Sequence, residues 1–284
     1  MRLNHNMNSL DIYSTYKKTL AKNYSAIGRI SSGVKLNSAK DNPNKLAQSE
    51  SMRIQIKSLQ SAQRNIQDAT SMIQTVDGSL TEVSNMLNKL KELTVSAADG
   101  TKAEDDKRII QNEINEIING IDQLAENSEF NGVKLIAGKN VVTNEYPEYR
   151  KLVIGSMVGE EMNIPVFNVS SKFLEDDKGN KLSDIDVVNN SQNAIDTVEQ
   201  AIGKVSGIRS EFGAVQNRLE STQDNLQVNT FILEKAESNF RDTDIALEMA
   251  NIAKTQILKD TSLALIAQSN QIPQEALRIL ERVK

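Results

Sequence analysis

Side chains that could carry out acid–base, nucleophilic or metal chemistry are scarce in this sequence. Its 284 residues include no Cys and no Trp, and the single His is His5. Without Cys, the chain can form no disulfide, no thiolate zinc site and no Cys nucleophile. Because terminal residues are usually poorly ordered, we interpret His5 as a solvated residue and not as a catalytic base. The composition therefore predicts neither an enzyme nor a bound cofactor.

Two charged stretches remain as candidates for a site. The segment "LEDDKGNKL" (174–182) lacks the ligand spacing of a calcium loop, and we expect a solvated turn there. The segment "KAEDDKR" (102–108) is expected to lead into a helix. Its residues Glu104, Asp105 and Asp106 would then lie in the first helical turn, where negative charge is favoured. Both stretches are thus interpreted as structural.

Net charge and hydropathy restrict the possible partners. With a formal charge of −5, the chain lacks the basic surface expected of a nucleic-acid-binding protein. No apolar run reaches the roughly 18–20 residues that cross a bilayer. The first residues, "MRLNHNMNSLDIYSTY" (1–16), contain no apolar signal-peptide segment. If the protein acts outside the cell, we expect it to leave by a route that needs no such signal.

The elements that would position any site are long helices. Apolar residues that recur every seven positions predict helices that wrap around one another with a left-handed supercoil. One such series comprises Met52, Leu59, Ile66, Ile73, Leu80 and Leu87. Another comprises Val198, Val205, Phe212, Leu219, Leu226, Leu233 and Phe240. A third alternates steps of four and three through Ile110, Ile114, Ile117, Ile121 and Leu124. We interpret these three helices as an antiparallel bundle within the chain.

The pattern changes between the second and third of these helices, in residues 131–186. This segment opens with the turn signal Asn-Gly and is rich in β-branched residues, Gly breaks and a Pro. We expect short strands and turns that form one or two hairpins packed on the end of the bundle. The fold class is therefore mainly α, with a small β-hairpin region.

A further interruption precedes the first long helix, in "RISSGVKLNSAKDNP" (29–43). We predict that Gly33 ends one helix and that Asn42 caps the next, with Pro43 in its first turn. Residues 34–36 favour an extended backbone between the two helices. The segment is thus expected to join two helical regions.

Both ends of the chain carry more apolar surface than two helices can bury against each other. At the N-terminus, the apolar positions are Leu3, Leu10, Tyr13, Leu20, Tyr24 and Ile27. At the C-terminus, apolar residues surround most of the helix, and they include Ile252, Ile257, Leu263 and Ile266. Helices of this kind must be buried on several sides. Interspersed charges such as Asp244, Glu248 and Lys254 argue against a membrane. The sequence therefore predicts self-assembly.

These segments resemble bacterial flagellin in both halves of the chain, whereas the middle matches loosely. Those similar to the flagellin N-terminal region are "RISSGVKLNSAKDNP" (29–43), "SLQSAQRNIQDATSMIQTVDGSL" (58–80) and "EFNGVKLI" (129–136). Those similar to its C-terminal region are "GAVQNRLEST" (213–222), "FRDTDIALEM" (240–249) and "ALIAQSNQIPQEALRIL" (264–280). Several independent segments in the right order make the resemblance specific.

The resemblance implies a structural subunit that polymerises with itself into the hollow, extracellular flagellar filament used for motility. It also implies export in an unfolded state through the flagellar type III apparatus, with an export chaperone and a filament cap protein as partners. The implied regions are D0 helices at 1–33 and 241–284, a spoke at 34–46, D1 helices at 47–130 and 187–240, and a hairpin region at 131–186. The outer domains D2 and D3 of larger flagellins are expected to be absent.

The resemblance further implies recognition by the host Toll-like receptor that senses flagellin. The contact candidates that match the family's footprint are Lys89, Leu93 and Glu113. Lys89 stands where the family commonly has Arg, so it keeps the charge but lacks the planar guanidinium fork. The alternative interpretation is that Lys89 and Glu113 are ordinary solvated helix charges. Glycosylation is common in the hairpin region of the family, where Ser156, Ser170 and Ser171 are available.

Three other classes of protein were weighed against the filament subunit. The hook–filament junction protein shares the terminal helices, and copy number per flagellum would distinguish the two. A chemoreceptor-type signalling coiled coil would need a membrane segment or a sensor domain. An enzyme would need a site, and Gly203 and Gly207 lie in a helical heptad instead of a phosphate loop after a strand.

Overall fold

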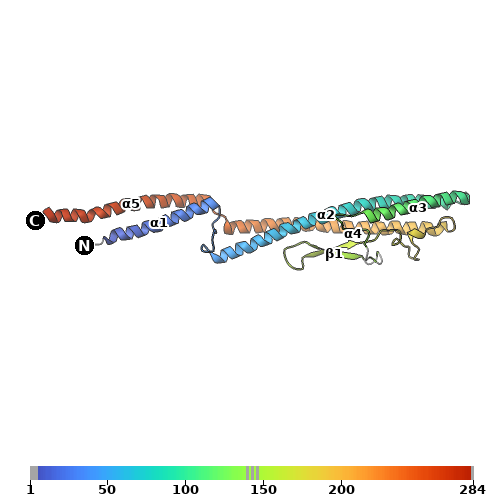
Figure 1. The fold of residues 1–284 in the computed structure, drawn as a ribbon, viewed down its shortest axis with the longest axis horizontal. Coiled ribbons are helices and arrows are strands. Elements are labelled where there is room, and N and C mark those ends of the chain that lie inside the picture. The colour runs from blue at the N-terminus through green and yellow to red at the C-terminus, as the bar shows by residue number, and fades with distance from the viewer. Residues whose placement is uncertain (1–5, 139–140, 142–143, 145–146, 283–284) are drawn as a thin grey trace. The chain divides into compact units, whose positions relative to one another are not determined.

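The computed structural model describes residues 6–138, 141, 144 and 147–282, and these residues form a mainly α fold, as predicted (Figure 1). The elements are α1 (Met7–Ser32), α2 (Pro43–Ala97), α3 (Glu104–Asn127), β1 (Glu148–Val153), β2 (Glu161–Val166), η1 (Leu182–Asp184), α4 (Ser191–Arg241) and α5 (Ile245–Arg282). The chain divides into two compact units. We call residues 1–56 and 231–284 the terminal unit, and residues 57–230 the bundle unit. None of the described helices is long and apolar enough to cross a bilayer.

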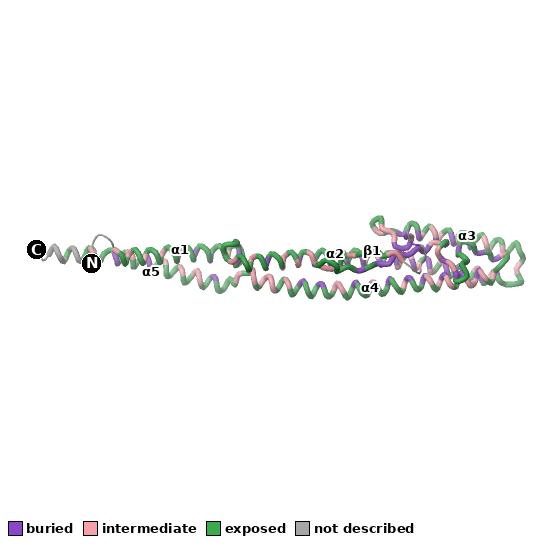
Figure 2. The backbone as a smooth tube through the Cα atoms, turned by 90° about the horizontal axis from the view of Figure 1, so that it is seen from below, coloured by how far each residue is buried: buried purple, intermediate pink, exposed green. Residues whose placement is uncertain are grey.

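An apolar core lies inside the bundle unit, where α2, α3 and α4 run side by side (Figures 1 and 2). The buried heptad residues are Leu59, Ile66, Ile73, Leu80, Leu87, Val205, Phe212, Leu219 and Leu226. The ring of Phe212 packs edge-on against Phe167 from the hairpin region, with centroids 5.6 Å apart. At the rim of this core, Arg209 Nε donates to Asp77 Oδ1 at 3.0 Å and joins α4 to α2.

The buried face of α3 differs in part from the face predicted by its four–three series. Ile114 and Ile121 are buried as expected, but Ile118 and Ala125 are also buried. The predicted positions Ile117 and Leu124 are only half-buried. The two sets have the same helical spacing of i, i+4, i+7 and i+11, so the buried face is the predicted face rotated by roughly 50° about the helix axis. The first turn of α3 carries the three acidic residues predicted there.

The hairpin region contains one antiparallel hairpin, in which β1 pairs with β2 from Glu148↔Val166 to Val153↔Glu161. One face of β2 is buried, through Met162, Ile164 and Val166. The hairpin lies along the flank of α2, where Asn65 Nδ2 donates to the carbonyl oxygen of Val153 at 3.2 Å. The expectation that it would pack on the end of the bundle was wrong, because α2 extends well beyond the hairpin.

The turn at 174–182 is more ordered than the solvated turn that the sequence predicted. The carboxylate of Asp176 is buried and accepts hydrogen bonds from the backbone N–H groups of Lys178 and Asn180 at 2.8 and 2.7 Å. Burial by itself raises the pKa of Asp176, but these bonds and one from the Asn180 side chain outweigh it and lower the pKa. Asp176 therefore fixes the turn instead of facing water.

Two of the three serines considered for glycosylation are engaged in the fold. Ser171 is only 1% exposed, and its N–H and hydroxyl both donate to the carboxylate of Asp122, at 2.6 and 2.8 Å. The hydroxyl of Ser170 donates to Asn168 Oδ1 at 2.8 Å. The expectation that Ser171 is available was therefore wrong, whereas Ser156 is half-exposed.

In the terminal unit, the caps follow the prediction. Gly33 ends α1 in the left-handed region, with φ of 71°, where an L side chain would be strained. Asn42 Oδ1 accepts from the N–H of Lys45 at 3.0 Å in the first turn of α2. Between them, the extended Val34 forms a β-bridge with Asp242 at the start of the link to α5. The segment is thus bonded to the α4–α5 connection and is not a loose linker.

Candidate functional site

The fully buried residues in the seam between α1 and α5 of the terminal unit are mostly polar, and Ala26 is the apolar exception. Thr19 and Asn23 of α1 are buried there, together with Ser262 and Ser269 of α5. Asn23 Nδ2 donates to Thr255 Oγ1 at 2.8 Å. At the end nearer the N-terminus, Asn6 Nδ2 donates to the carbonyl oxygen of Ser269 at 2.8 Å. Hydrogen-bonded polar pairs bury little apolar surface and therefore give little hydrophobic stabilisation.

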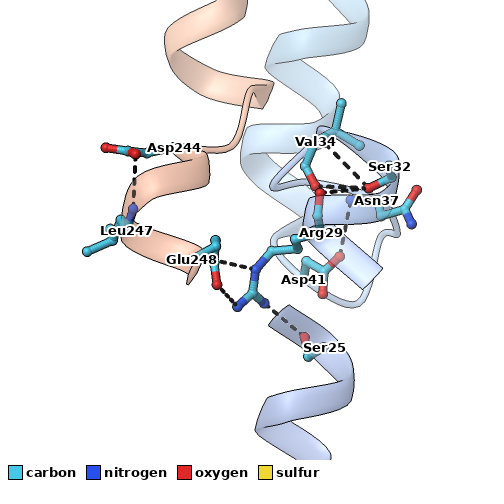
Figure 3. A network of polar contacts seen from close by, with 9 residues as sticks. All are labelled: Ser25, Arg29, Ser32, Val34, Asn37, Asp41, Asp244, Leu247 and Glu248. Atoms are coloured by element: carbon cyan, nitrogen blue, oxygen red, sulfur yellow. Dashed lines mark hydrogen bonds and ion pairs between the residues drawn. The ribbon is translucent and has the colours of Figure 1, made fainter. Parts of the chain in front are cut away.

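A charged pair closes the other end of the seam (Figure 3). The guanidinium of Arg29 donates through Nε and Nη2 to the two carboxylate oxygens of Glu248, at 2.8 and 3.0 Å. The same guanidinium donates to Ser25 Oγ at 2.8 Å. The hydrogen bond from Arg29 lowers the pKa of Glu248, and the pKa of Arg29 is raised in turn. Bidentate pairs of this kind add geometric specificity to the contact.

The outward faces of α1 and α5 carry many large apolar side chains. The exposed large apolar residues on α1 are Met7, Leu10, Tyr13, Tyr24 and Ile27. Those on α5 are Ile245, Leu247, Met249, Ile257, Leu258, Leu263, Leu265 and Ile272. Figure 2 shows the two helices largely in the colour of exposed residues. Exposed apolar surface on this scale is a mark of an interaction surface.

The residues predicted for polymerisation are divided between the two sides of the pair. Leu10, Ile27, Ile257 and Leu263 are exposed on the outside. Those that are half-buried are Leu20, Ile252 and Ile266. The apolar periodicity did not predict that polar residues lie inside the pair, although a sequence signal for it is present. Polar residues recur every seven positions along α5, at Glu248, Thr255, Ser262 and Ser269, and such a column predicts a polar seam.

The three receptor-contact candidates lie on the surface of the bundle unit. Lys89 is exposed on α2 and forms an ion pair with Glu92 at 3.3 Å. Leu93 is half-buried, and Glu113 is exposed on α3. With a rise of 1.5 Å per residue, Lys89 and Glu113 both lie about 12–14 Å from the loop between their helices. They are therefore at the same level of the α2–α3 hairpin.

A shallow cleft of about 430 Å³ lies beside the hairpin and is lined by residues that include Asn65, Asp68, Met72 and Leu152. Among the described residues, no group of His, Asp and Glu side chains is placed to hold a metal ion. His5 and Leu3, which the sequence analysis considered, lie outside the described residues.

Comparisons with known proteins identify the family. The model of the bacterial flagellin N-terminal helical region matches residues 3–141, and that of the C-terminal helical region matches residues 195–280. The flagellin of Bacillus subtilis is 36% identical over 303 residues, covering 99% of this chain and 100% of the relative. The flagellin of Halalkalibacterium halodurans is 34% identical over 280 residues, with the same coverage.

One solved structure, at low sequence identity, supports the fold and does not bear on the function. A putative flagellar hook-associated protein from Vibrio parahaemolyticus has a TM-score of 0.58 at 15% identity and covers 71% of this chain and 100% of its own. Flagellins are structural proteins, not enzymes, and form the bacterial flagellar filament outside the cell. The chain belongs to the bacterial flagellin family, and its 284 residues fit a short form of that family.

Proposed function

We propose that this flagellin polymerises by burying the outward apolar faces of α1 and α5 against other copies of itself. One observation carries the proposal: most of the fully buried residues between α1 and α5 are polar, whereas many large apolar residues of the two helices are exposed. In water, such a pair leaves its apolar surface exposed. In a hollow filament, neighbouring copies would cover that surface on several sides.

The proposed regions follow the family's organisation. The D0 helices are assigned to 1–33 and 241–284, the spoke to 34–46, the D1 helices to 47–130 and 187–240, and the hairpin region to 131–186. The heptad residues of α2 and α4 would hold D1 together. The end of α1 at Ser32 and of α4 at Arg241 supports this assignment. The two compact units divide instead at 56/57 and 230/231, within α2 and α4.

Assembly would couple folding of the terminal helices to binding. The polar seam contributes little burial of apolar surface, so α1 and α5 are marginally stable in the free subunit. Copies that cover the outer faces would supply the missing burial. A chain with marginal terminal helices and no disulfide is also suited to export in an unfolded state, with the export chaperone and the filament cap as partners.

Removal of residues 265–284 tests the proposal. The bundle unit should remain folded, because its core residues lie outside the deletion, and filaments should no longer form. Circular dichroism would report the helical content, and electron microscopy would show whether filaments grow. Filaments from the shortened chain would refute the proposal. Counting copies per flagellum distinguishes a filament subunit, with thousands, from a junction protein, with a single ring.

We further propose that the host Toll-like receptor contacts Lys89, Leu93 and Glu113. Their shared level on the α2–α3 hairpin and the exposure of the two charged side chains support this assignment. The variant Lys89→Arg would restore the bidentate fork and strengthen recognition. A receptor-reporter assay with soluble subunit would measure the strength of recognition. The variant Lys91→Arg on the same helix serves as the matched control. An unchanged response to Lys89→Arg would contradict the assignment.

A further inference from the structure

A proline interrupts the backbone hydrogen bonding of α5 near its C-terminal end. Pro273 lies inside this helix and has no backbone N–H. In an uninterrupted helix, that N–H would donate to the carbonyl oxygen four residues earlier, which belongs to Ser269. The proline ring also crowds this carbonyl and pushes it away from the helix. The carbonyl of Ser269 is therefore free for a donor that lies outside α5.

The donor is the side chain of Asn6, at the start of α1. Asn6 Nδ2 donates to the carbonyl oxygen of Ser269 at 2.8 Å, and it also lies 3.3 Å from Asn270 Oδ1. The oxygen of the same amide caps α1, because Asn6 Oδ1 accepts from the N–H of Ser9 at 3.2 Å. One side chain thus caps α1 and occupies the carbonyl that Pro273 leaves free.

The hydroxyl groups along the seam by themselves permit more than one alignment of the two helices. Thr255, Ser262 and Ser269 follow one another on α5 at intervals of seven residues. If α1 moved along α5 by seven residues, about 10 Å, Asn23 would leave Thr255 and find a second hydroxyl at Ser262. By contrast, residues 245–282 contain a single Pro, so only one carbonyl of α5 is freed in this way.

We infer that Asn6 is a positioning residue, which sets the register of α1 on α5 by donating to the carbonyl that Pro273 leaves free. The ion pair of Arg29 with Glu248 holds the same register at the other end of the seam. The inference concerns a contact within one chain. It deepens the proposed function and rests on it, because a single register gives every copy the same outward faces of α1 and α5.

Cross-linking of introduced thiols tests the inference, because the natural chain contains no Cys. The pair Asn23→Cys with Thr255→Cys reports the observed register, and Asn23→Cys with Ser262→Cys reports a shift of seven residues. A short bifunctional thiol reagent traps either pair whenever it forms, so it reads the register even of a marginal helix pair. In the free subunit, adding Asn6→Asp should lower the ratio of observed to shifted product about tenfold.

The variant Asn6→Asp separates the contact from the cap. Aspartate caps a helix about as well as asparagine, so the bond from the N–H of Ser9 is kept. A carboxylate has no N–H to donate to Ser269. The matched control is Asn8→Asp, which places the same charge at an exposed position in the first turn of α1 and should leave the ratio unchanged. An unchanged ratio in Asn6→Asp, an equal fall in Asn8→Asp, or no product of the observed register in the natural background would overturn the inference.

The variant Pro273→Ala gives a second result that a purely structural role would not give. Alanine restores the N–H that bonds to Ser269, so the helical content measured by circular dichroism should rise. The ratio of observed to shifted product should nevertheless fall, and adding Asn6→Asp should lower it little further, because both changes remove the same contact. Gln271→Ala, at an exposed position of the same helix, is the control and should leave the ratio unchanged. A higher ratio in Pro273→Ala would mean that the proline only weakens α5, and would overturn the inference.

These measurements separate the inference from the proposed function, because they are made on the free subunit and need no polymer. An unchanged ratio in the variants of Asn6 and Pro273 would refute the inference and leave the proposed burial of the outward faces intact. Filaments from the chain that lacks residues 265–284 would refute the proposed function instead.

Discussion

The bundle unit and the terminal unit place apolar and polar residues in opposite ways. In the bundle unit, the heptad residues of α2 and α4, such as Leu80 and Leu219, are buried in the core. In the terminal unit, the seam between α1 and α5 buries Thr19 and Asn23, while Tyr24 and other large side chains face outward. The first arrangement is stable in a single chain. The second leaves large apolar side chains exposed to water in a single chain.

The largest expected effect comes from creating a cavity in the core of the bundle unit. Phe212→Ala removes a fully buried ring and its edge-on contact with Phe167. We expect the free energy of unfolding of the monomer to fall by about 3–5 kcal/mol, as measured by urea denaturation. The contrasting variant is Ile257→Ala on the outside of α5, which should leave monomer stability unchanged and weaken assembly. A similar loss of monomer stability in both variants would contradict the comparison.

The next effect concerns the charged pair at the end of the polar seam. Glu248→Gln removes the carboxylate that accepts two hydrogen bonds from Arg29. We expect the α1–α5 contact to weaken by about 1.5–3 kcal/mol, because hydrogen bonds to charged groups contribute roughly that amount. Faster hydrogen exchange of the α5 amides, with exchange of the α4 amides unchanged, would show that the contact is weaker. Unchanged exchange in α5 would mean that the pair does not hold the helices together.

Lowering the pH should weaken the same contact between Arg29 and Glu248. The hydrogen bond from Arg29 keeps the pKa of Glu248 below its usual 4.5. The stabilisation is therefore fully present above that value and is lost as the pH falls through the lowered pKa. Asp41 and Glu50, also in the terminal unit, have lowered pKa values through backbone hydrogen bonds and the side chain of Arg241, respectively. In Glu248→Gln, the acid-induced rise in α5 exchange should be smaller than in the natural chain.

The sequence predicted the two long helices well because a single periodic signal governs them. The seven-residue series from Leu59 to Leu87 is buried throughout, and Gly33 and Asn42 cap their helices as expected. Heptad positions such as Tyr13 and Ile27 were not informative in α1, because an apolar residue at a regular spacing does not show which side faces the partner.

Local sequence patterns in the hairpin region predicted less of the observed structure. A charged stretch was interpreted as solvated, yet Asp176 is buried by tertiary hydrogen bonding that no local pattern shows. Ser171 likewise donates hydrogen bonds to the carboxylate of Asp122, which is distant in the sequence. The candidate surface itself was predicted from the excess of apolar residues at both ends. The polar seam was not predicted, because the periodicity of apolar residues does not report the seven-residue spacing of polar ones.

The smallest expected effect comes from replacing a polar pair in the seam between α1 and α5 with apolar residues. Replacing the pair formed by Asn23 and Thr255 with Leu at both positions removes a buried polar contact without leaving either partner unsatisfied. Because apolar burial replaces it, the α1–α5 pair should gain about 1 kcal/mol in the free subunit. Hydrogen exchange of the monomer would then show slower exchange in α1 and α5, and the single variant Asn23→Leu should lack this gain.

The same double variant also tests why the seam is polar. If the polar residues serve to specify register, as buried polar residues do in some coiled coils, a Leu pair should stabilise the helices yet permit shifted pairings. Filaments of the double variant would then be irregular under the electron microscope although the monomer is more stable. Regular filaments with a more stable monomer would show that the polar seam is not needed for register. In that case its function would be confined to keeping the free subunit marginally folded.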